Sequence, residues 1–203
     1  MNQANRPYYT LAEYLKMEQS SEYKNEYFRG EIFQMAGGTV SHNRIIFNLS
    51  GLLYQKLIGS ACEAFNSDMR LLVEPNGLYT YPDLMVTCGP LELAPGRTDT
   101  IINPLVIIEV LSTSTAEYDR TDKFELYKAL DTLQNYLLVD QHRAYIQCFW
   151  RVAGEPRRWT VETYRHLNES LKLPALDVSL GLKEIYSRVV WPKTTNEHPI
   201  PTE

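Results

Sequence analysis

The middle of the chain reads YPDLMVT (81–87), then PLVIIEVLS (104–112), then DRTDKFELY (119–127). The first two segments are apolar runs that each contain one acid, Asp83 and Glu109. Burying a carboxylate among such residues costs free energy unless a bound cation or a positive side chain compensates for it. Both acids therefore indicate a function, because a sequence selected only for stability usually has an apolar residue there.

The two apolar runs are typical of β-strands. Residues 105–111 form a short segment rich in β-branched side chains, and the preceding proline is tolerated at the start of a strand. If the two strands are neighbours, Asp83 and Glu109 can lie on one face at one end of a sheet. Two carboxylates and several waters are the usual way to hold Mg²⁺, because this ion keeps much of its hydration shell. The alternative is a pair of buried acids that cap turns or bind arginine, but two acids in adjacent strands favour a metal site.

A lysine follows the second strand on a predicted helix. Residues 112–115 offer several N-caps, and Asp119, Lys123 and Tyr127 then share one helix face because they are spaced by four. Near two metal-bound carboxylates, Lys123 could position and polarise an attacking water. The alternative is a surface ion pair between Asp119 and Lys123, and the spacing alone favours that alternative.

These residues resemble a known nuclease superfamily. Pro82-Asp83, followed by Glu109 on a later strand, is similar to the PD-(D/E)XK motif, although the position where that motif has lysine is Leu111. The run IIEVLSTST, the D-x-x-x-K-x-x-x-Y helix and NYLLVD (135–140) resemble one branch, the Uma-type putative restriction endonuclease domain family. In that branch Lys123 is the matching lysine. The resemblance extends from about residue 10 to residue 188.

The resemblance implies hydrolysis of DNA phosphodiester bonds with Mg²⁺ or Mn²⁺ as cofactor, in a restriction-endonuclease-like fold. Asp83, Glu109 and the Val110 carbonyl are the implied metal ligands, with Lys123 orienting the water and Tyr127 supporting Lys123. Cutting both strands of a duplex usually needs two sites, so a homodimer is expected. The alternatives are a catalytically silent nucleic-acid-binding or interaction module, and a hydrolase of another phosphodiester.

Composition agrees with a folded protein. The 203 residues are 44% hydrophobic, which predicts one domain at 10–190, with a loose leader at 1–9 and a polar tail at 191–203. We expect no membrane span and no signal peptide, because there is no run of 18 apolar residues and the start is polar. Three cysteines without metal spacing suggest reduced thiols and a cytoplasmic protein. The net charge of −5 argues mildly against tight non-specific DNA binding.

The clearest helix is expected after a Ser41 cap, with an apolar stripe that runs to residue 57. His42, in its first turn, is either a phosphate contact or general acid/base, or a helix-start histidine that bonds a neighbouring loop. Arg44 and Lys56 could contact phosphates, although surface charges usually serve only solubility.

Two further features have open functional interpretations. The loop 91–100 is long enough to act as a lid or a substrate contact. Trp150 and Trp159 could stack on bases, but tryptophans on strands more often serve packing.

The remaining pattern alternates strands and helices and predicts an α/β (α+β) fold with a mixed central sheet flanked by helices. We expect helices at 10–17 (from a Thr10/Glu13 capping box) and 182–190, and strands at 22–28, 31–36, 62–65, 69–74, 135–139, 144–151 and 159–164.

Overall fold

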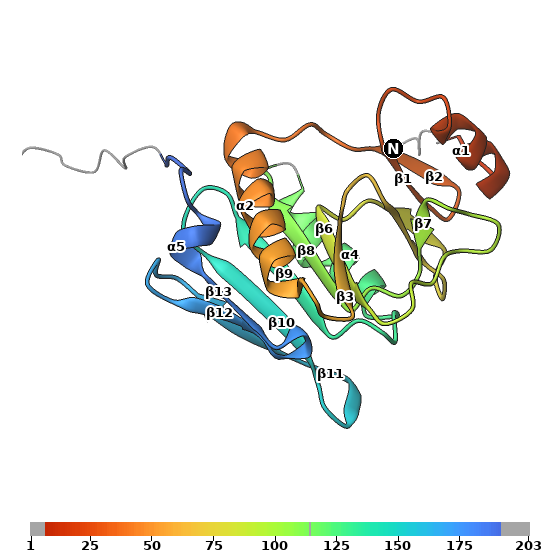
Figure 1. The fold of residues 1–203 in the computed structure, drawn as a ribbon. Coiled ribbons are helices and arrows are strands. Elements are labelled where there is room, and N and C mark those ends of the chain that lie inside the picture. Colours follow the sequence, from red (N-terminus) through yellow and green to blue (C-terminus); the bar gives the residue numbers. More distant parts are fainter. Residues whose placement is uncertain (1–6, 114, 192–203) are drawn as a thin grey trace, which may run out of the picture.

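A computed structural model describes residues 7–113 and 115–191, and it shows a mixed α and β fold with two main sheets (Figure 1). The six-stranded sheet runs, in spatial order, through β11 (Glu155–Tyr164), β10 (Ile146–Val152), β9 (Asn135–Asp140), β8 (Val106–Leu111), β6 (Leu84–Cys88) and β3 (Cys62–Asn66). The five-stranded sheet runs through β2 (Glu31–Gln34), β1 (Asn25–Phe28), β5 (Leu78–Thr80), β4 (Arg70–Val73) and β7 (Thr100–Ile101).

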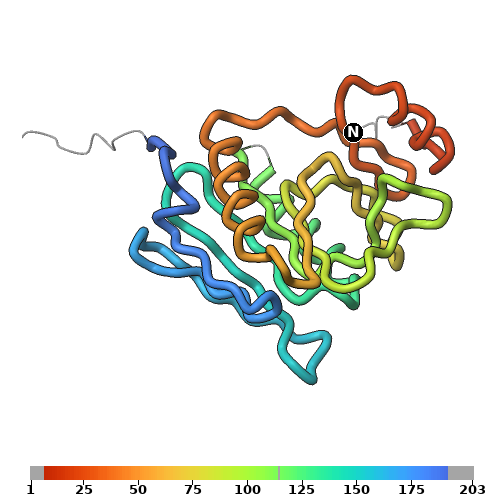
Figure 2. Tube along the Cα trace, in the orientation of Figure 1, coloured from red at the N-terminus to blue at the C-terminus, as the bar shows by residue number. Residues whose placement is uncertain are grey.

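The helices and one hairpin cover these sheets. They are α1 (Leu11–Glu18), α2 (Val40–Leu57), α3 (Ala116–Arg120), α4 (Asp122–Tyr127) and α5 (Leu182–Ile185), together with the hairpin of β12 (Ser170–Leu173) and β13 (Val178–Gly181), whose strands are joined by the 3₁₀ turn η1 (Pro174–Leu176). The expected fold class is confirmed, and the five-stranded sheet and the β12–β13 hairpin add to the expected central sheet. Figure 2 shows how the chain passes from the five-stranded sheet into α2 and then into the six-stranded sheet.

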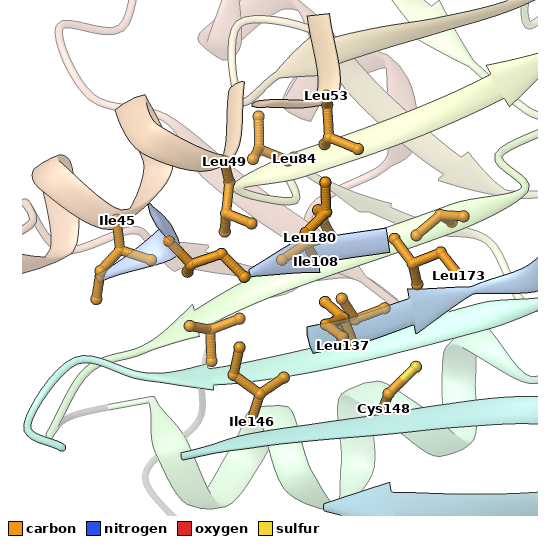
Figure 3. Packing of buried hydrophobic residues seen from close by; sticks show 14 of the residues in the cluster. Ile45, Leu49, Leu53, Leu84, Ile108, Leu137, Ile146, Cys148, Leu173 and Leu180 are labelled. Carbon is orange, nitrogen blue, oxygen red and sulfur yellow. The ribbon is translucent and has the colours of Figure 1, made fainter. Parts of the chain in front are cut away.

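Strand β8 lies inside the six-stranded sheet and divides its residues between two cores. Val106, Ile108 and Val110 face a cluster formed with α2 and the β12–β13 hairpin (Figure 3). Ile107 and Leu111 face the opposite cluster, which contains side chains of α4 and the five-stranded sheet. Because side chains alternate along a strand, Glu109 projects toward α4 rather than toward α2.

The connection from β8 to β9 explains why α4 lies over Glu109. These two strands are parallel, in contrast to the antiparallel neighbours β6–β8 and β9–β10. A parallel pair needs a crossover, and here the crossover consists of α3 and α4. The predicted single helix around Lys123 is in fact broken at Thr121, which has non-helical dihedral angles of −116° and −91°.

The N-terminal region forms the predicted helix and hairpin. The Thr10/Glu13 capping box begins α1, with the Thr10 amide 2.7 Å from Glu13 Oε2. Arg29 and Gly30 form the turn between β1 and β2 with φ of 49° and 89°. Positive φ at both positions is the geometry of a two-residue hairpin.

Helix α2 begins slightly earlier than the sequence suggests. Thr39, not Ser41, is the N-cap, and its hydroxyl accepts the His42 amide at 3.1 Å. The apolar stripe packs as expected, because Ile45, Leu49 and Leu53 are fully buried against the six-stranded sheet (Figure 3).

Two of the cysteines differ from the expectation of reduced thiols. Cys62 and Cys88 lie opposite each other on β3 and β6 and form a disulfide, while Cys148 is free and buried. Direct cross-strand pairing brings the two side chains together. Because the cysteines are 26 residues apart in the sequence, the sequence alone does not reveal this contact. The cysteine pattern therefore no longer supports a reducing compartment.

None of the helices within residues 7–113 and 115–191 is long and apolar enough to cross a membrane. Residues 7–9 of the expected leader attach to the β1–β2 hairpin, where the Tyr9 amide donates to the Gly30 carbonyl at 2.8 Å. The rest of the leader, residues 1–6, and the expected tail at 192–203 lie outside the described residues.

Candidate functional site

Asp83 and Glu109 lie opposite each other where β6 and β8 pair. The register aligns Leu84 with Ile108, so the next residues, Asp83 and Glu109, also face each other. Two hydrogen bonds cross this step: the Val110 amide donates to Asp83 Oδ2 at 2.7 Å, and the Asp83 amide donates to Glu109 Oε2 at 3.3 Å. Asp83 itself precedes β6 rather than lying inside a strand as predicted. The backbone thus fixes both carboxylates at one end of the sheet.

Lys123 extends from α4 to these acids. Its Nζ lies 3.0 Å from Glu109 Oε1 and 3.6 Å from Asp119 Oδ1, and the side chain is buried. The interaction with Asp119 is therefore part of an internal cluster and not the surface ion pair that the spacing allows. Burial by itself lowers the pKa of Lys123, but the surrounding acids, Glu109 foremost, hold it well above its usual value. Lys123 is consequently a permanent cation at the site.

Glu26 is a member of the cluster that the sequence pattern did not identify. It lies on β1, in the other sheet, and its Oε1 is 2.9 Å from Lys123 Nζ and 2.5 Å from the Thr80 hydroxyl. Glu26 is buried, and its neighbours on the strand are the half-buried Asn25 and the buried Tyr27. The strand itself was expected at 22–28, but Glu26 did not stand out there, because that segment also contains the polar residues Glu22 and Lys24 and is not an apolar run.

Tyrosines and a second acid surround the ion pair. The Tyr127 hydroxyl donates to Glu109 Oε1 at 2.9 Å, and the Tyr136 hydroxyl donates to the Asp119 carbonyl at 2.8 Å. Burial raises the pKa of Glu109 above its usual range, and Lys123 offsets only part of this effect. Burial likewise raises the pKa of Asp119. Glu109 and Asp119 therefore keep their protons to a higher pH than free carboxyl groups do, and a bound cation would favour their charged forms.

His42 approaches the same acids from the start of α2. Its Nε2 lies 3.3 Å from Asp83 Oδ2, which agrees with a role at the site better than with a bond to a neighbouring loop. Burial lowers the pKa of His42, but the hydrogen bond and the charge of Asp83 outweigh burial and raise it above its usual value. Gly38 makes this placement possible, because a Cβ there would lie 2.7 Å from His42 Nδ1.

The charged side chains of this cluster line one cleft of about 830 Å³, together with His42. Its acids are Glu26, Asp83, Glu109, Asp119, Asp122 and Glu125, against the permanent cations Arg29 and Lys123. A second part of the cleft is apolar and consists of Phe28, Phe33, Met35 and Leu126. The excess of acids at the polar end is suited to a bound cation.

The donor set fits Mg²⁺ or Mn²⁺ better than a metal that needs a dense ligand cage. Within the described residues, no three His, Cys, Asp or Glu side chains are grouped as metal ligands. Mg²⁺ is usually held by one or two carboxylates, keeps several waters and prefers oxygen ligands. Asp83 and Glu109 supply such oxygens, and the Val110 backbone adjoins them in the cleft.

Other candidates lie away from this cleft. Arg44 donates to the Arg188 carbonyl at 2.9 Å, and Trp159 packs edge-on against Phe124. The loop 91–100 packs beside β4, where the Asp99 carbonyl accepts the Arg70 amide at 2.9 Å. None of these residues lines the cleft, and neither do Lys56 and Trp150. A lid role for the loop and a base-stacking role for the tryptophans at the cleft therefore have no support.

Comparisons relate the chain to a protein family and to proteins of similar sequence. The Uma2 family model, described as putative restriction endonuclease, matches residues 11–183. The uncharacterized protein sll1609 of Synechocystis sp. is 39% identical over 150 residues, which are 74% of this chain and 84% of that protein. The uncharacterized protein slr1290 of the same organism is 36% identical over 174 residues, which are 86% of this chain and 89% of that protein.

A solved structure shares the fold. A crystal structure of a putative nuclease belonging to DUF820, from Anabaena variabilis, superposes with a TM-score of 0.72 at 20% sequence identity. The match covers 89% of this chain and 99% of that one. At this level of identity, the likeness establishes the fold alone.

Proposed function

Because the chain belongs to the Uma2 family of putative restriction endonucleases, we propose that it is a Mg²⁺- or Mn²⁺-dependent endonuclease that hydrolyses DNA phosphodiester bonds. The observation that carries the proposal is the meeting of Asp83, Glu109 and Lys123 at the polar end of one cleft. Three segments far apart in the sequence supply the cluster, and its acids exceed its cations.

Asp83, Glu109 and the Val110 carbonyl would hold the metal ion. When bound, such an ion lowers the pKa of a coordinated water and neutralises charge on the scissile phosphate. Lys123 orients the attacking water and stabilises the oxyanion that develops on the phosphate. Because the pKa of Lys123 is raised, it acts as a fixed cation and does not remove a proton from the water.

Glu26 and Tyr127 position the reacting groups. Glu26 and Glu109 both hold the Lys123 ammonium, and the Tyr127 hydroxyl fixes the orientation of the Glu109 carboxylate. His42 contacts Asp83 and has a raised pKa, so it can contact a phosphate oxygen or give a proton to the leaving oxygen.

The expected substrate is duplex DNA, and the proposal includes a homodimer that brings two sites to the two strands. It also places the protein in the cytoplasm, where cellular DNA is accessible. Neither the homodimer nor the cytoplasmic location is inferred from the cysteines, two of which form a disulfide.

A second function has one observation in its favour. Lys123 is buried and bonded to Glu26, Glu109 and Asp119, which is also how a purely structural ion cluster looks. The protein would then be a silent nucleic-acid-binding or interaction module that retains the nuclease fold. Such a module has no reason to bind a divalent ion tightly.

Cleavage of a supercoiled plasmid with Mg²⁺ or Mn²⁺ tests the proposal. Asp83→Asn, Glu109→Gln and Lys123→Ala should each lower the rate by about 100-fold or more, because each removes a ligand charge or the cation near the reacting water. Glu155→Gln, an exposed acid on β11, is the matched control and should cleave normally. Equal cleavage by Glu109→Gln and Glu155→Gln would remove the basis of the proposal.

A further inference from the structure

The outer face of α2 exposes an unusual number of large apolar side chains. Val40, Phe47, Tyr54 and Ile58 are 66%, 75%, 70% and 67% exposed. Single exposed apolar residues need no explanation, but a contiguous group on one helix is typical of an interaction site.

These residues follow the spacing of a helix–helix contact. Together with Arg44 and Gly51 they form a series with steps of four, three, four, three and four residues, in which Ile58 is the C-cap directly after α2. We call this series the α2 seam: Val40, Arg44, Phe47, Gly51, Tyr54 and Ile58. This alternation keeps side chains on one stripe and lets them interlock with a second helix.

Gly51 stands near the middle of the seam. Glycine is unfavourable inside a helix, and a Cβ at Gly51 would have no neighbour within 4 Å. Packing within this chain therefore does not require a glycine. A second helix that approaches closely at this point does require a small residue.

The α2 seam is separate from both the core and the cleft. Ile45, Leu49 and Leu53 occupy the opposite face of α2 and point toward the sheet (Figure 3). His42 also lies on that side, where it contacts Asp83. In Figure 1 the outer side of α2, drawn in orange, has no other element over it. A partner on the seam would leave the cleft open.

We propose that the α2 seam is the two-fold interface of a homodimer, in which α2 packs antiparallel against its copy and the two helices cross at Gly51. A two-fold axis at Gly51 places Arg44, which also donates to the Arg188 carbonyl of its own chain, opposite Ile58 of the partner subunit, near the C-terminal end of that helix. A cation is favourable there because of the helix dipole. Helix α2 carries no acid, so two chains of net charge −5 can meet at this face without opposing carboxylates.

The available area agrees with a second copy as the occupant. The four apolar side chains of the seam expose on the order of 500 Å², since one aromatic side chain can bury about 150–250 Å². A groove of about 560 Å³ continues from Tyr54 and Ile58 to the edge strand β3. The groove extends the apolar area of the seam toward the roughly 800 Å² per partner of a standard interface, and it places Glu63 at the margin of the contact. The undescribed segments 1–6 and 192–203 contain only Met1 and Ile200 as large apolar residues, too few to cover the seam.

Light scattering and sedimentation of the full chain, at about 1 to 100 μM, test the proposal over the range in which standard interfaces form. The wild type should be a dimer. Tyr54→Glu should weaken the dimer by at least about thirtyfold, as expected when an interface hot spot is lost. Tyr23→Glu is the matched control, because Tyr23 is 61% exposed but lies outside the seam, and it should remain dimeric.

Gly51→Leu distinguishes a loss of the dimer interface from a loss of the fold. Leucine favours a helix over glycine, so a variant that keeps its circular dichroism but becomes monomeric supports close approach at Gly51. A wild type that is monomeric at every concentration would overturn the proposal, as would a Gly51→Leu variant that stays dimeric. If Tyr54→Glu leaves the mass unchanged and instead weakens binding to a duplex oligonucleotide, the seam is a nucleic-acid surface and the dimer is wrong.

Discussion

Two buried charge networks in this protein differ in balance and in access. The first centres on Lys123, which alone faces three acids, Glu26, Glu109 and Asp119, and it lines the cleft. The second centres on Arg70 and lies outside the cleft.

The Arg70 network is balanced in charge, although within the described residues Arg70 Nη1 is buried without a hydrogen-bond partner. Arg70 Nε donates to the Tyr81 hydroxyl at 2.8 Å, and that hydroxyl donates to Glu18 at 2.8 Å. Asp99 lies 3.9 Å from Arg70 and also binds Arg97. Two cations therefore match two acids. A network that neutralises itself stabilises the fold, whereas one with excess acids beside a cleft is suited to binding a cation.

The largest effect should follow from removing the single cation of the first network. Lys123→Met leaves three buried acids without a positive partner, which should destabilise the protein by about 3–5 kcal/mol at neutral pH. Chemical unfolding without added metal measures this loss. If the loss of stability were smaller than that caused by changing a surface lysine, as in Lys16→Met, the acids would already be neutral in the folded chain.

Arg70→Met should have a smaller effect, about 2 kcal/mol, because it removes hydrogen bonds and a partly exposed ion pair but leaves its acids accessible to other partners. Cleavage per folded molecule should not change, since Arg70 does not line the cleft. Unfolding curves and plasmid cleavage on the same sample separate the two outcomes. A loss of cleavage larger than the loss of folded protein would connect the two networks.

The smallest effects come from a matched pair of Asp→Asn changes. Burial raises the pKa of Asp99, but Arg97 and Thr100 outweigh it, so the net pKa is lowered and its charge stabilises the fold above the unfolded pKa. The pKa of Asp119 is raised, so its charge opposes folding above the unfolded pKa.

Asp99→Asn should therefore destabilise the protein at pH 7, and this difference should vanish as the pH falls through the lowered pKa. Asp119→Asn should stabilise it at pH 7 and be neutral below about pH 4, the usual value for an aspartate. Melting curves from about pH 3 to 8, a range that includes the usual pKa of an aspartate, test the sign of both changes in stability. Shifts of the same sign in the two variants would contradict the contrast between the networks.

The sequence predicted the parts of the site that belong to local patterns. Asp83 and Glu109 stood out because each interrupts an apolar strand. Lys123 was assigned to the site through the family resemblance, since its helical spacing alone favoured a surface pair with Asp119. Their expected roles remain predictions. The burial of Lys123 was not predictable, since it depends on the crossover from β8 to β9.

Glu26 and the Cys62–Cys88 disulfide show why the rest of the structure could not be read from the sequence. Glu26 reaches Lys123 across almost a hundred residues, through a second sheet whose pairing no local pattern reveals. The cysteines meet because β3 and β6 pair in register, which depends on the whole sheet. The β12–β13 hairpin was also not predicted, although Ser170–Leu173 alternates between exposed polar and buried apolar residues, because its strands are only four residues long.

Divalent-ion binding is the most direct test of the claim that the Lys123 network is a metal site and the Arg70 network is structural. Titration of the full chain with Mn²⁺ alone, followed by electron paramagnetic resonance, counts bound ions without requiring cleavage. We predict Mn²⁺ binding that is lost in Asp83→Asn and Glu109→Gln and retained in Asp99→Asn. Binding that survives in Asp83→Asn and Glu109→Gln, or no binding by the wild type at millimolar Mn²⁺, would contradict the account.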